Sequence, residues 1–422
     1  MEKDFSYAEK IAALAVVICP LCEPYRMFGL SMDFLLIIVS SLLVVFASLS
    51  QGFKFFLPRP LLLFTLYGLT IPVYFGITGG YAKDAFGELK TILVFVLGLA
   101  FILPYLRFDL LRKYYRIIVI FVSIIFLIQL LFALVGRPFS ALIPFFELKY
   151  ESTDMASFIE GQKSQNRFSS MFLEPSHFAQ YLLPMLVIQF GNCFNLKKYY
   201  NAASVFLLLM LLLIRSGVGL ILGALSWFIM LLGAHISKSR KVWILTLAVL
   251  SILIFVPLYL NSDIGSEVAG RTSEITYSED ANTSGSKRIW NGYFAYSDLP
   301  FKYKITGVSS DGLESAMDNS QFSFLFDYSK FVNNIHILLI GYGLIGFLLF
   351  FSFLRFLYKK SSDIGRGILI LFTLLCFMEG FFFTGKMFFW LGIIMCCNEH
   401  VSSVVSKDKK YLNYPHHIPV FG

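Results

Sequence analysis

The chain has 422 residues, of which 57% are hydrophobic and only 15% charged, and its formal net charge is +8. Soluble globular chains carry about 25% charged residues, so this composition excludes a large soluble enzyme. The positive charge collects in short loops on alternate sides of apolar segments. The positive-inside rule predicts that distribution for a membrane protein, which argues against nucleic acid as a partner.

Repeated apolar runs near 18 residues predict transmembrane helices, because ~20 residues cross the ~30 Å hydrocarbon layer. The first run, Ile11–Cys22, follows two lysines but precedes no small-residue cleavage site, so we expect a retained helix and not a removed signal peptide. Eleven further spans are expected at Phe34–Ser50, Leu61–Thr78, Thr91–Leu106, Ile117–Gly136, His177–Phe190, Ala202–Ile214, Val218–Ala234, Val242–Leu260, Ile335–Leu357, Ile368–Phe381 and Met387–Cys397. The expected fold is an all-α polytopic membrane protein of about 12 transmembrane helices.

These spans divide the chain into four parts. The parts are transmembrane helices 1–9 over residues 1–260 with a smaller outer loop at 137–176, a large polar loop at 261–333, helices 10–12 over 334–397, and a tail at 398–422. The basic loops and the tail all fall on one side, so that side and both termini are expected in the cytoplasm. The 261–333 loop, with ten acidic and six basic residues, lies opposite. In a bacterium that side is the periplasm.

Two apolar stretches do not divide cleanly into single spans. Ala202–Ala234 is too long for one helix and short for two, and Arg215-Ser216-Gly217 lies near its middle. We expect two half-length helices that meet at an outer turn around Arg215. Ile368–Cys397 has the same character, with Glu379 and Thr384-Gly385-Lys386 at its middle. Such half-length helices place charged residues at or slightly below the outer surface.

Arg215 and the segment 167–177 are the first candidates for a site. A charge inside an apolar stretch indicates function by default, although an arginine at a helix end can also snorkel to lipid headgroups. Glu174-Pro175 suits a helix start, because the first helical turn tolerates proline and the positive end of the helix dipole favours a carboxylate. The alternative reading places Arg167, Glu174 and His177 at the outer interface, facing the same aqueous space as the large loop.

The large loop and its end supply further candidates. Lys287-Arg288 precedes Trp290, and an arginine presents a planar fork that matches phosphate oxygens, although most loop arginines are simply solvated. The turn chemistry of Asp298-Leu-Pro300 and Gly307–Gly312 predicts a compact loop. Beyond it, His336 near the membrane surface is a candidate base, because histidine titrates near neutrality.

Three features together resemble bacterial O-antigen polymerases, members of the wider O-antigen ligase and polymerase group. They are Arg167 followed by Phe172-Leu-Glu174-Pro175-Ser176-His177-Phe-Ala, then Ile214-Arg215-Ser216-Gly217 at a helix turn, and a large outer loop that closes on Asn333 before Gly343-Leu-Ile-Gly346. Within the loop, Gly285…Arg288-Ile-Trp290, Leu299-Pro300-Phe301 and Gly307 also look like the ligase pattern. The resemblance covers roughly residues 165–350.

The resemblance implies a GT-C-like membrane glycosyltransferase of the bacterial inner membrane. It would join oligosaccharide repeat units carried on undecaprenyl pyrophosphate at the periplasmic face, in lipopolysaccharide biosynthesis. Arg215 and Arg288 would hold the lipid pyrophosphate, and Glu174, His177 or His336 would accept a proton. Substrate-binding roles are expected for Arg167, Lys287, Trp290 and Asn333. We expect no cofactor and no obligatory metal. Expected partners are the lipid-linked oligosaccharide, membrane lipids and a chain-length regulator protein.

Two other functions compete with polymerisation. An O-antigen ligase would transfer polymer to lipid A-core, but ligases place a histidine directly before the asparagine that corresponds to Asn333, and this chain has Val332 there. Glu174-Pro175-Ser176 also favours polymerase over ligase. A flippase for the same lipid-linked sugars would have short loops on both sides, whereas here one loop of ~73 residues dominates.

Overall fold

The computed structural model describes residues 5–79, 84–143, 145–149, 168–195, 200–233, 284–323 and 332–397, with the single positions 239, 242 and 246. Side chains are described throughout these ranges except at 51, 194–195 and 284–289. The expected span Val242–Leu260, Arg167 and the tail at 398–422 therefore lie outside the described residues, apart from two isolated positions in that span. Lys287 and Arg288 are described only as part of a helix.

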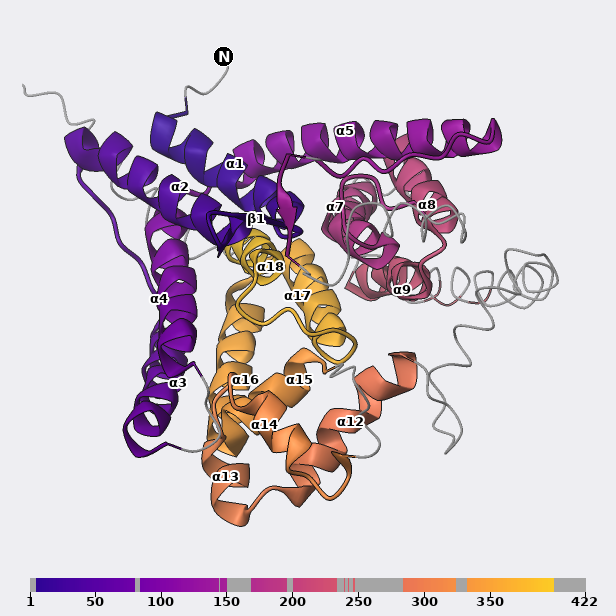
Figure 1. Cartoon of the computed structure of the whole chain (residues 1–422). Coiled ribbons are helices and arrows are strands. Elements are labelled where there is room, and N and C mark those ends of the chain that lie inside the picture. Colours follow the sequence, from indigo (N-terminus) through magenta and orange to yellow (C-terminus); the bar gives the residue numbers. More distant parts are fainter. Residues whose placement is uncertain are drawn as a thin grey trace, which may run out of the picture.

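The described chain is mostly helical (Figure 1). Its helices are α1 (Tyr7–Cys22), α2 (Met32–Ser48), α3 (Arg59–Thr78), α4 (Ala85–Ile102), α5 (Phe108–Leu134), α7 (Pro175–Asn195), α8 (Ala202–Ile214), α9 (Gly217–Gly233), α12 (Ser284–Asp298), α13 (Phe301–Thr306), α14 (Leu313–Asp318), α15 (Asn334–His336), α16 (Gly343–Lys360), α17 (Asp363–Cys376) and α18 (Gly385–Cys396). Short turns η1 (Leu49–Gln51), η2 (Leu103–Tyr105) and η4 (Ile337–Gly341) extend three of them.

Three of these helices are long and apolar enough to cross a membrane: Arg59–Thr78, Ala85–Tyr105 and Phe108–Leu134. Shorter apolar helices accompany them at α2, α8, α9 and α18. The structure is mostly helical, as predicted, and its apolar helices are consistent with a membrane-embedded protein. The number of spans and the GT-C-like arrangement stay predictions.

A small antiparallel sheet, which the sequence analysis did not anticipate, lies beside the start of α2. Strand β1 (Tyr25–Met27) pairs with β2 (Leu30–Ser31) on one side and with β3 (Glu147–Leu148) on the other. Between β1 and β2, Phe28 and Gly29 have φ values of 54° and 74°. Two successive left-handed residues make the tight turn whose twist matches a hairpin. The sheet thus joins the segment after α1 to the segment after α5.

The helices pack as two groups around α18. Helices α3, α4 and α16 run together, and α7, α8 and α9 form a second group, while α5 lies across the bundle (Figure 1). Every residue of α18 is buried, and it packs against α1 and α17. At Gly392 a side chain would collide with Val16 of α1, so glycine permits the close approach of the first and last described helices.

The predicted span Ile335–Leu357 is not one continuous helix, which corrects the sequence analysis. The chain passes from α15 through the π-helical turn η4 and bends at Gly343 before α16 begins. Gly343 has a φ of 63°, and a Cβ atom there would lie 2.3 Å from the carbonyl oxygen of Ile305. Only glycine tolerates both conditions, and the loop that supplies Ile305 lies far away in the sequence.

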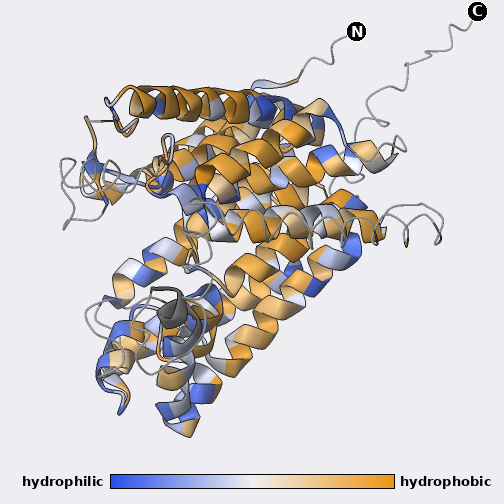
Figure 2. Cartoon of the chain, turned by 90° about the vertical axis from the view of Figure 1, so that its right-hand side faces the viewer, coloured by the Kyte–Doolittle hydropathy of each residue, from blue (hydrophilic) through white to orange (hydrophobic). Residues whose placement is uncertain are grey.

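The described part of the large loop, residues 284–323, is compact, as its turn chemistry predicted. Helices α12, α13 and α14 are joined at Leu299-Pro300 and at Gly307–Gly312. Glu88 of α4 fastens this arrangement, because its carboxylate accepts hydrogen bonds from Ser309 Oγ, the backbone N–H of Ser310 at 3.1 Å and the Tyr342 hydroxyl at 2.8 Å. Figure 2 shows hydrophilic residues concentrated at this lower end, whereas the bundle above is mainly hydrophobic.

Candidate functional site

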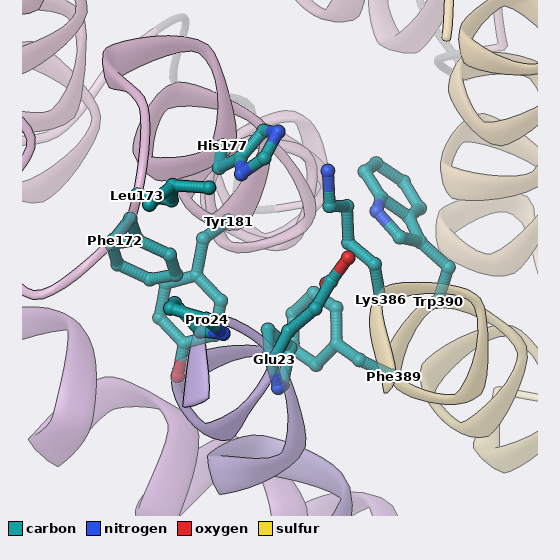
Figure 3. A pocket seen from close by; sticks show the side chains of 10 residues that line it. Glu23, Pro24, Phe172, Leu173, His177, Tyr181, Lys386, Phe389 and Trp390 are labelled. Atoms are coloured by element: carbon teal, nitrogen blue, oxygen red, sulfur yellow. The ribbon is translucent and has the colours of Figure 1, made fainter. Parts of the chain in front are cut away.

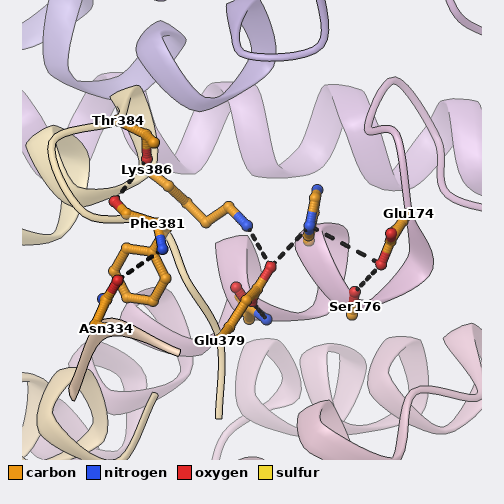
Figure 4. A network of polar contacts seen from close by, with 9 residues as sticks. Glu174, Ser176, Asn334, Glu379, Phe381, Thr384 and Lys386 are labelled. Atoms are coloured by element: carbon orange, nitrogen blue, oxygen red, sulfur yellow. Dashed lines mark hydrogen bonds and ion pairs between the residues drawn. The ribbon is translucent and has the colours of Figure 1, made fainter. Parts of the chain in front are cut away.

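The first turn of α7 and the connection between α17 and α18 together form a buried polar centre (Figure 4). Glu379 lies in that connection, and its Oε1 accepts from His177 Nε2 at 2.8 Å and from Lys386 Nζ at 2.8 Å. Its Oε2 accepts from the Gln180 amide. We call Glu379, His177, Lys386 and Gln180 the Glu379 cluster. It joins one predicted site residue, His177, to three that the sequence analysis did not include.

Local sequence explains how α7 presents this side of the cluster. Pro175 begins the helix, and Glu174 precedes it, which is the helix start that the sequence predicted. His177 and Gln180 are three residues apart, so both project from the same face of α7. Glu174 lies at the edge: its carboxylate accepts from Ser176 Oγ at 3.0 Å, and its side chain is 45% exposed.

Electrostatics favours a charged Glu379 despite its burial. Glu379 and Lys386 are 8% and 5% exposed. Lys386 Nζ and His177 Nε2 both contact the same Glu379 oxygen at 2.8 Å. A buried carboxylate that accepts several charge-assisted hydrogen bonds stays ionised for this reason. The cluster is therefore a preformed ion pair with a histidine attached to its anion.

The end of the large loop holds the backbone around Glu379. Asn334 donates its backbone N–H to the Glu379 carbonyl oxygen at 3.0 Å, and its side-chain oxygen accepts from the Phe381 N–H at 2.7 Å. Asn333 Nδ2 donates to the Phe377 carbonyl oxygen at 2.9 Å. Asn333 was predicted to bind substrate. In the structure it is 1% exposed and fixes the connection that carries Glu379.

Lys386 is positioned by a carboxylate from the other end of the chain. The backbone N–H of Gly385, the first residue of α18, donates to Asp33 Oδ2 at 2.7 Å. Asp33 is fully buried in the first turn of α2. Thr384 makes no side-chain cap, so Asp33 satisfies an N–H at this helix end. The α18 start, and with it Lys386, is thus tied to α2.

A narrow pocket lies beside the cluster (Figure 3). It is lined by Pro20, Glu23, Pro24, Phe172, Leu173, His177, Tyr181, Lys386, Phe389 and Trp390. Figure 3 shows Glu23, His177 and Lys386 extending into the space between the aromatic rings. The free space holds little more than a water molecule, so a larger ligand enters only if long side chains such as those of Glu23 and Lys386 move aside.

Two buried polar atoms near the cluster lack hydrogen-bond partners among the described residues. They are Trp390 Nε1, whose ring lines the pocket and is fully buried, and Gln180 Oε1. An unsatisfied buried donor or acceptor costs roughly 1–3 kcal/mol. A polar ligand or a water molecule would relieve this cost, as an acceptor at the indole N–H or as a donor at the amide oxygen.

Arg215 occupies the turn between α8 and α9, as the sequence predicted. It ends α8 with a left-handed φ of 55° and is partly exposed. The following helix packs tightly on α7, because a Cβ atom at Gly219 would lie 2.5 Å from the Cβ atom of Ala179. Ala179 is two residues from His177, so the Arg215 turn lies toward the same end of α7 as the Glu379 cluster.

The loop helix α12 covers His336 and not the pocket. The Tyr293 ring lies edge-on to the His336 ring, with 4.5 Å between the ring centroids. A Cβ atom at Gly292 would lie 2.1 Å from His336 Cγ. His336 is fully buried, with Nδ1 accepting from the Asn333 N–H at 3.3 Å. It packs the loop onto η4 and is not among the residues that line the pocket. Trp290, predicted to bind substrate, is 40% exposed on α12.

The residues that sequence reasoning missed had partial signals. Glu379 and Lys386 were recognised as charges interrupting the stretch Ile368–Cys397, but nothing in the sequence joined them to His177. Asp33 and Glu23 sit beside apolar helices, where a carboxylate is costly unless partnered. Among the described residues, no group of three or more His, Cys, Asp or Glu side chains is arranged to hold a metal ion.

Comparison with protein-family models and with curated proteins finds no match for this chain. The residues themselves must therefore support any function.

Proposed function

We propose that the chain is a membrane glycosyltransferase that polymerises O-antigen repeat units carried on undecaprenyl pyrophosphate, at the periplasmic face of a bacterial inner membrane. The observation that carries the proposal is the contact between His177 and Glu379 beside a pocket in a mainly apolar helix bundle. Ionisable residues are expensive among membrane helices and mark functional sites by default. The same His177 belongs to the motif that resembles the polymerases.

The hydrogen bond to Glu379 prepares His177 as a base. Nε2 donates its hydrogen to the carboxylate, which leaves Nδ1 as the lone-pair nitrogen. In the proposed reaction an acceptor sugar hydroxyl attacks the anomeric carbon of the donor, and its oxygen forms the new glycosidic bond. The bond from that carbon to the pyrophosphate oxygen breaks, and the pyrophosphate leaves with the electron pair. The hydroxyl proton passes to Nδ1, and Glu379 stabilises the resulting imidazolium.

The negative charge around the pocket suggests separate binding places for the acceptor sugar and for the donor pyrophosphate. Glu23, Glu174 and Glu379 bring three carboxylates near the single cation of Lys386. An anionic surround disfavours a pyrophosphate and accepts a sugar hydroxyl. We therefore place the acceptor sugar at the pocket and the donor pyrophosphate at Arg215 and Arg288, whose planar forks suit phosphate oxygens. Preorganised arginines of this kind stabilise the charge that develops on the leaving group.

Contacts between distant segments agree with the proposed topology. The sheet joins the segments after α1 and α5, and Asp84 before α4 donates its backbone N–H to Asp311. Asn334 contacts the connection after α17. The positive-inside rule had assigned all of these segments to the outer side. Their contacts support an outer site built from several loops.

Deleting the gene tests the proposal against both alternatives. Loss of the polymerase is expected to leave lipopolysaccharide with a single repeat unit, seen on gels as one band above the core. Loss of all O-antigen from the core would instead identify the ligase. Repeat units that accumulate on the cytoplasmic face would identify a flippase, and unchanged lipopolysaccharide would refute all three.

A further inference from the structure

An apolar groove lies between α16 and α17, apart from the Glu379 cluster. One wall is Phe351, Leu354, Arg355 and Tyr358 of α16, and the other is Leu369, Ile370, Thr373 and Leu374 of α17. The α16 residues are spaced three and four apart, so they form one face of that helix. Apart from Arg355, every lining side chain is uncharged. Thr373 turns its hydroxyl to the Leu369 carbonyl oxygen at 2.9 Å, which leaves its methyl group for the groove.

Arg355 is the one charged group of this groove. It is exposed and forms no ion pair or side-chain hydrogen bond within the described part of the chain. It lies five residues before the end of α16, about 7.5 Å along the helix axis at 1.5 Å per residue. An arginine at that depth in an apolar wall needs an anion or water at its head.

Positive charge gathers at the same end of the groove. Lys359 and Lys360 are exposed at the end of α16, and Asp363 begins α17. Asp363 forms an ion pair with Arg366, whose Nη1 donates to it at 3.1 Å. Within the described residues, Arg355, Lys359 and Lys360 therefore have no carboxylate partner and can attract an anion.

We propose that this groove binds an anionic phospholipid. Its phosphate meets the Arg355 fork beside Tyr358, and an acyl chain runs along Phe351 and Leu374 toward the membrane centre. The combination of a long apolar wall and a cationic end fits one lipid better than a soluble ligand, which would need polar groups along the wall. Basic pockets between membrane helices recognise phospholipid headgroups in this way. The proposal does not depend on the glycosyltransferase activity.

Native mass spectrometry of the purified full-length protein tests the proposal, with phosphatidylglycerol and phosphatidylcholine added in turn. The unsubstituted protein is expected to retain one phosphatidylglycerol in preference to phosphatidylcholine. Arg355→Gln is expected to weaken that retention about tenfold, since loss of a charged hydrogen bond changes affinity by roughly that factor. Arg116→Gln, at an exposed arginine of α5 that does not line the groove, is the matched control, and it is expected to change retention less than about twofold.

Thr373→Phe supplies a second variant that fills the groove and leaves Arg355 in place. It is expected to displace the lipid as strongly as Arg355→Gln, and equal thermal unfolding temperatures would show that all variants fold. Equal retention of the two lipids by the unsubstituted protein would overturn the proposal. So would unchanged phosphatidylglycerol retention in both groove variants, or a dimer in the spectra that occupies this face.

Discussion

His177 and Glu379 meet at 2.8 Å although they belong to different quarters of the chain. His177 lies in the first turn of α7, and Glu379 lies in the non-helical connection between α17 and α18. This contact orients His177 as a base and gives it Glu379 as a fixed counter-ion.

His177→Ala is expected to lower glycosyl transfer about 10²–10⁴-fold, the usual contribution of a general base. Glu379→Gln keeps the side-chain volume but removes the counter-ion of the imidazolium, so it is also expected to lower transfer. The measurement is polymer formed per minute from lipid-linked repeat units. Thr70→Ala, at an exposed position of α3 where the hydroxyl donates only to the Tyr67 carbonyl oxygen, serves as the control. Full activity of His177→Ala would exclude the base role.

The ion pair between Glu379 and Lys386 predicts a non-additive effect on stability. Lys386→Met leaves a buried carboxylate without its main partner and is expected to cost about 3–5 kcal/mol of folding free energy. The double variant with Glu379→Gln removes both charges and is expected to recover most of that cost. Thermal unfolding of the detergent-solubilised variants measures both effects. A double variant less stable than Lys386→Met alone would contradict the ion-pair assignment.

Arg215 offers a way to separate charge from backbone geometry. Its left-handed φ of 55° tolerates asparagine well, so Arg215→Asn removes the fork and keeps the turn. We expect this variant and Arg288→Ala to insert normally and to form no polymer ladder, because the pyrophosphate loses its clamp. Arg215→Lys keeps the charge without the bidentate geometry, so its polymer yield is expected to lie between those of the unsubstituted protein and Arg215→Asn. Full-length ladders in Arg215→Asn and Arg288→Ala would refute the clamp.

Gly307 tests how the loop is fastened to the bundle. Its φ is 84°, and a Cβ atom there would lie 2.2 Å from the Gly341 carbonyl oxygen. Gly307→Ala is therefore expected to destabilise the protein by at least about 1 kcal/mol and to loosen α13. Protease sensitivity of the loop is the measurement. Gly233→Ala, where a side chain meets nothing within 4 Å, is the control, and equal protection of the two variants would contradict the prediction.

Apolar runs predicted helices such as α2, α3 and α4, because the hydrophobicity of a continuous segment is a local property of the sequence. The Arg215 turn and the compact loop were also predictable, since a charge in an apolar stretch and proline or glycine turns are local signals. The bend at Gly343 was not, because the carbonyl of Ile305 that requires it comes from a remote loop. The small sheet was not predictable either, because strands of two or three residues are too short to show an alternating pattern.

In the candidate site, too, local sequence signals were predictable and contacts between distant residues were not. Glu174 and His177 carry a helix-start signal, so the sequence predicted their place at the beginning of α7. Glu379 and Lys386 carried only the signal of charge in an apolar stretch. Which of several intramembrane charges meet is decided by helix packing, and a single sequence contains no record of that packing. His336 had the right chemistry, but its burial under α12 depends on Gly292, whose role the sequence did not reveal.

The contact of α18 with α1 and α2 has a consequence for biogenesis. Val16 packs on Gly392, and Asp33 satisfies the N–H of Gly385. Residue 33 is synthesised long before residue 385, so α1 and α2 enter the membrane before their partner α18 exists. Chains that stop before residue 385 are expected to leave the α18 side of α1 uncovered and the Asp33 Oδ2 atom without its N–H donor, and therefore to be substrates for membrane proteases. Docking of α18 is thus a step that quality control can recognise.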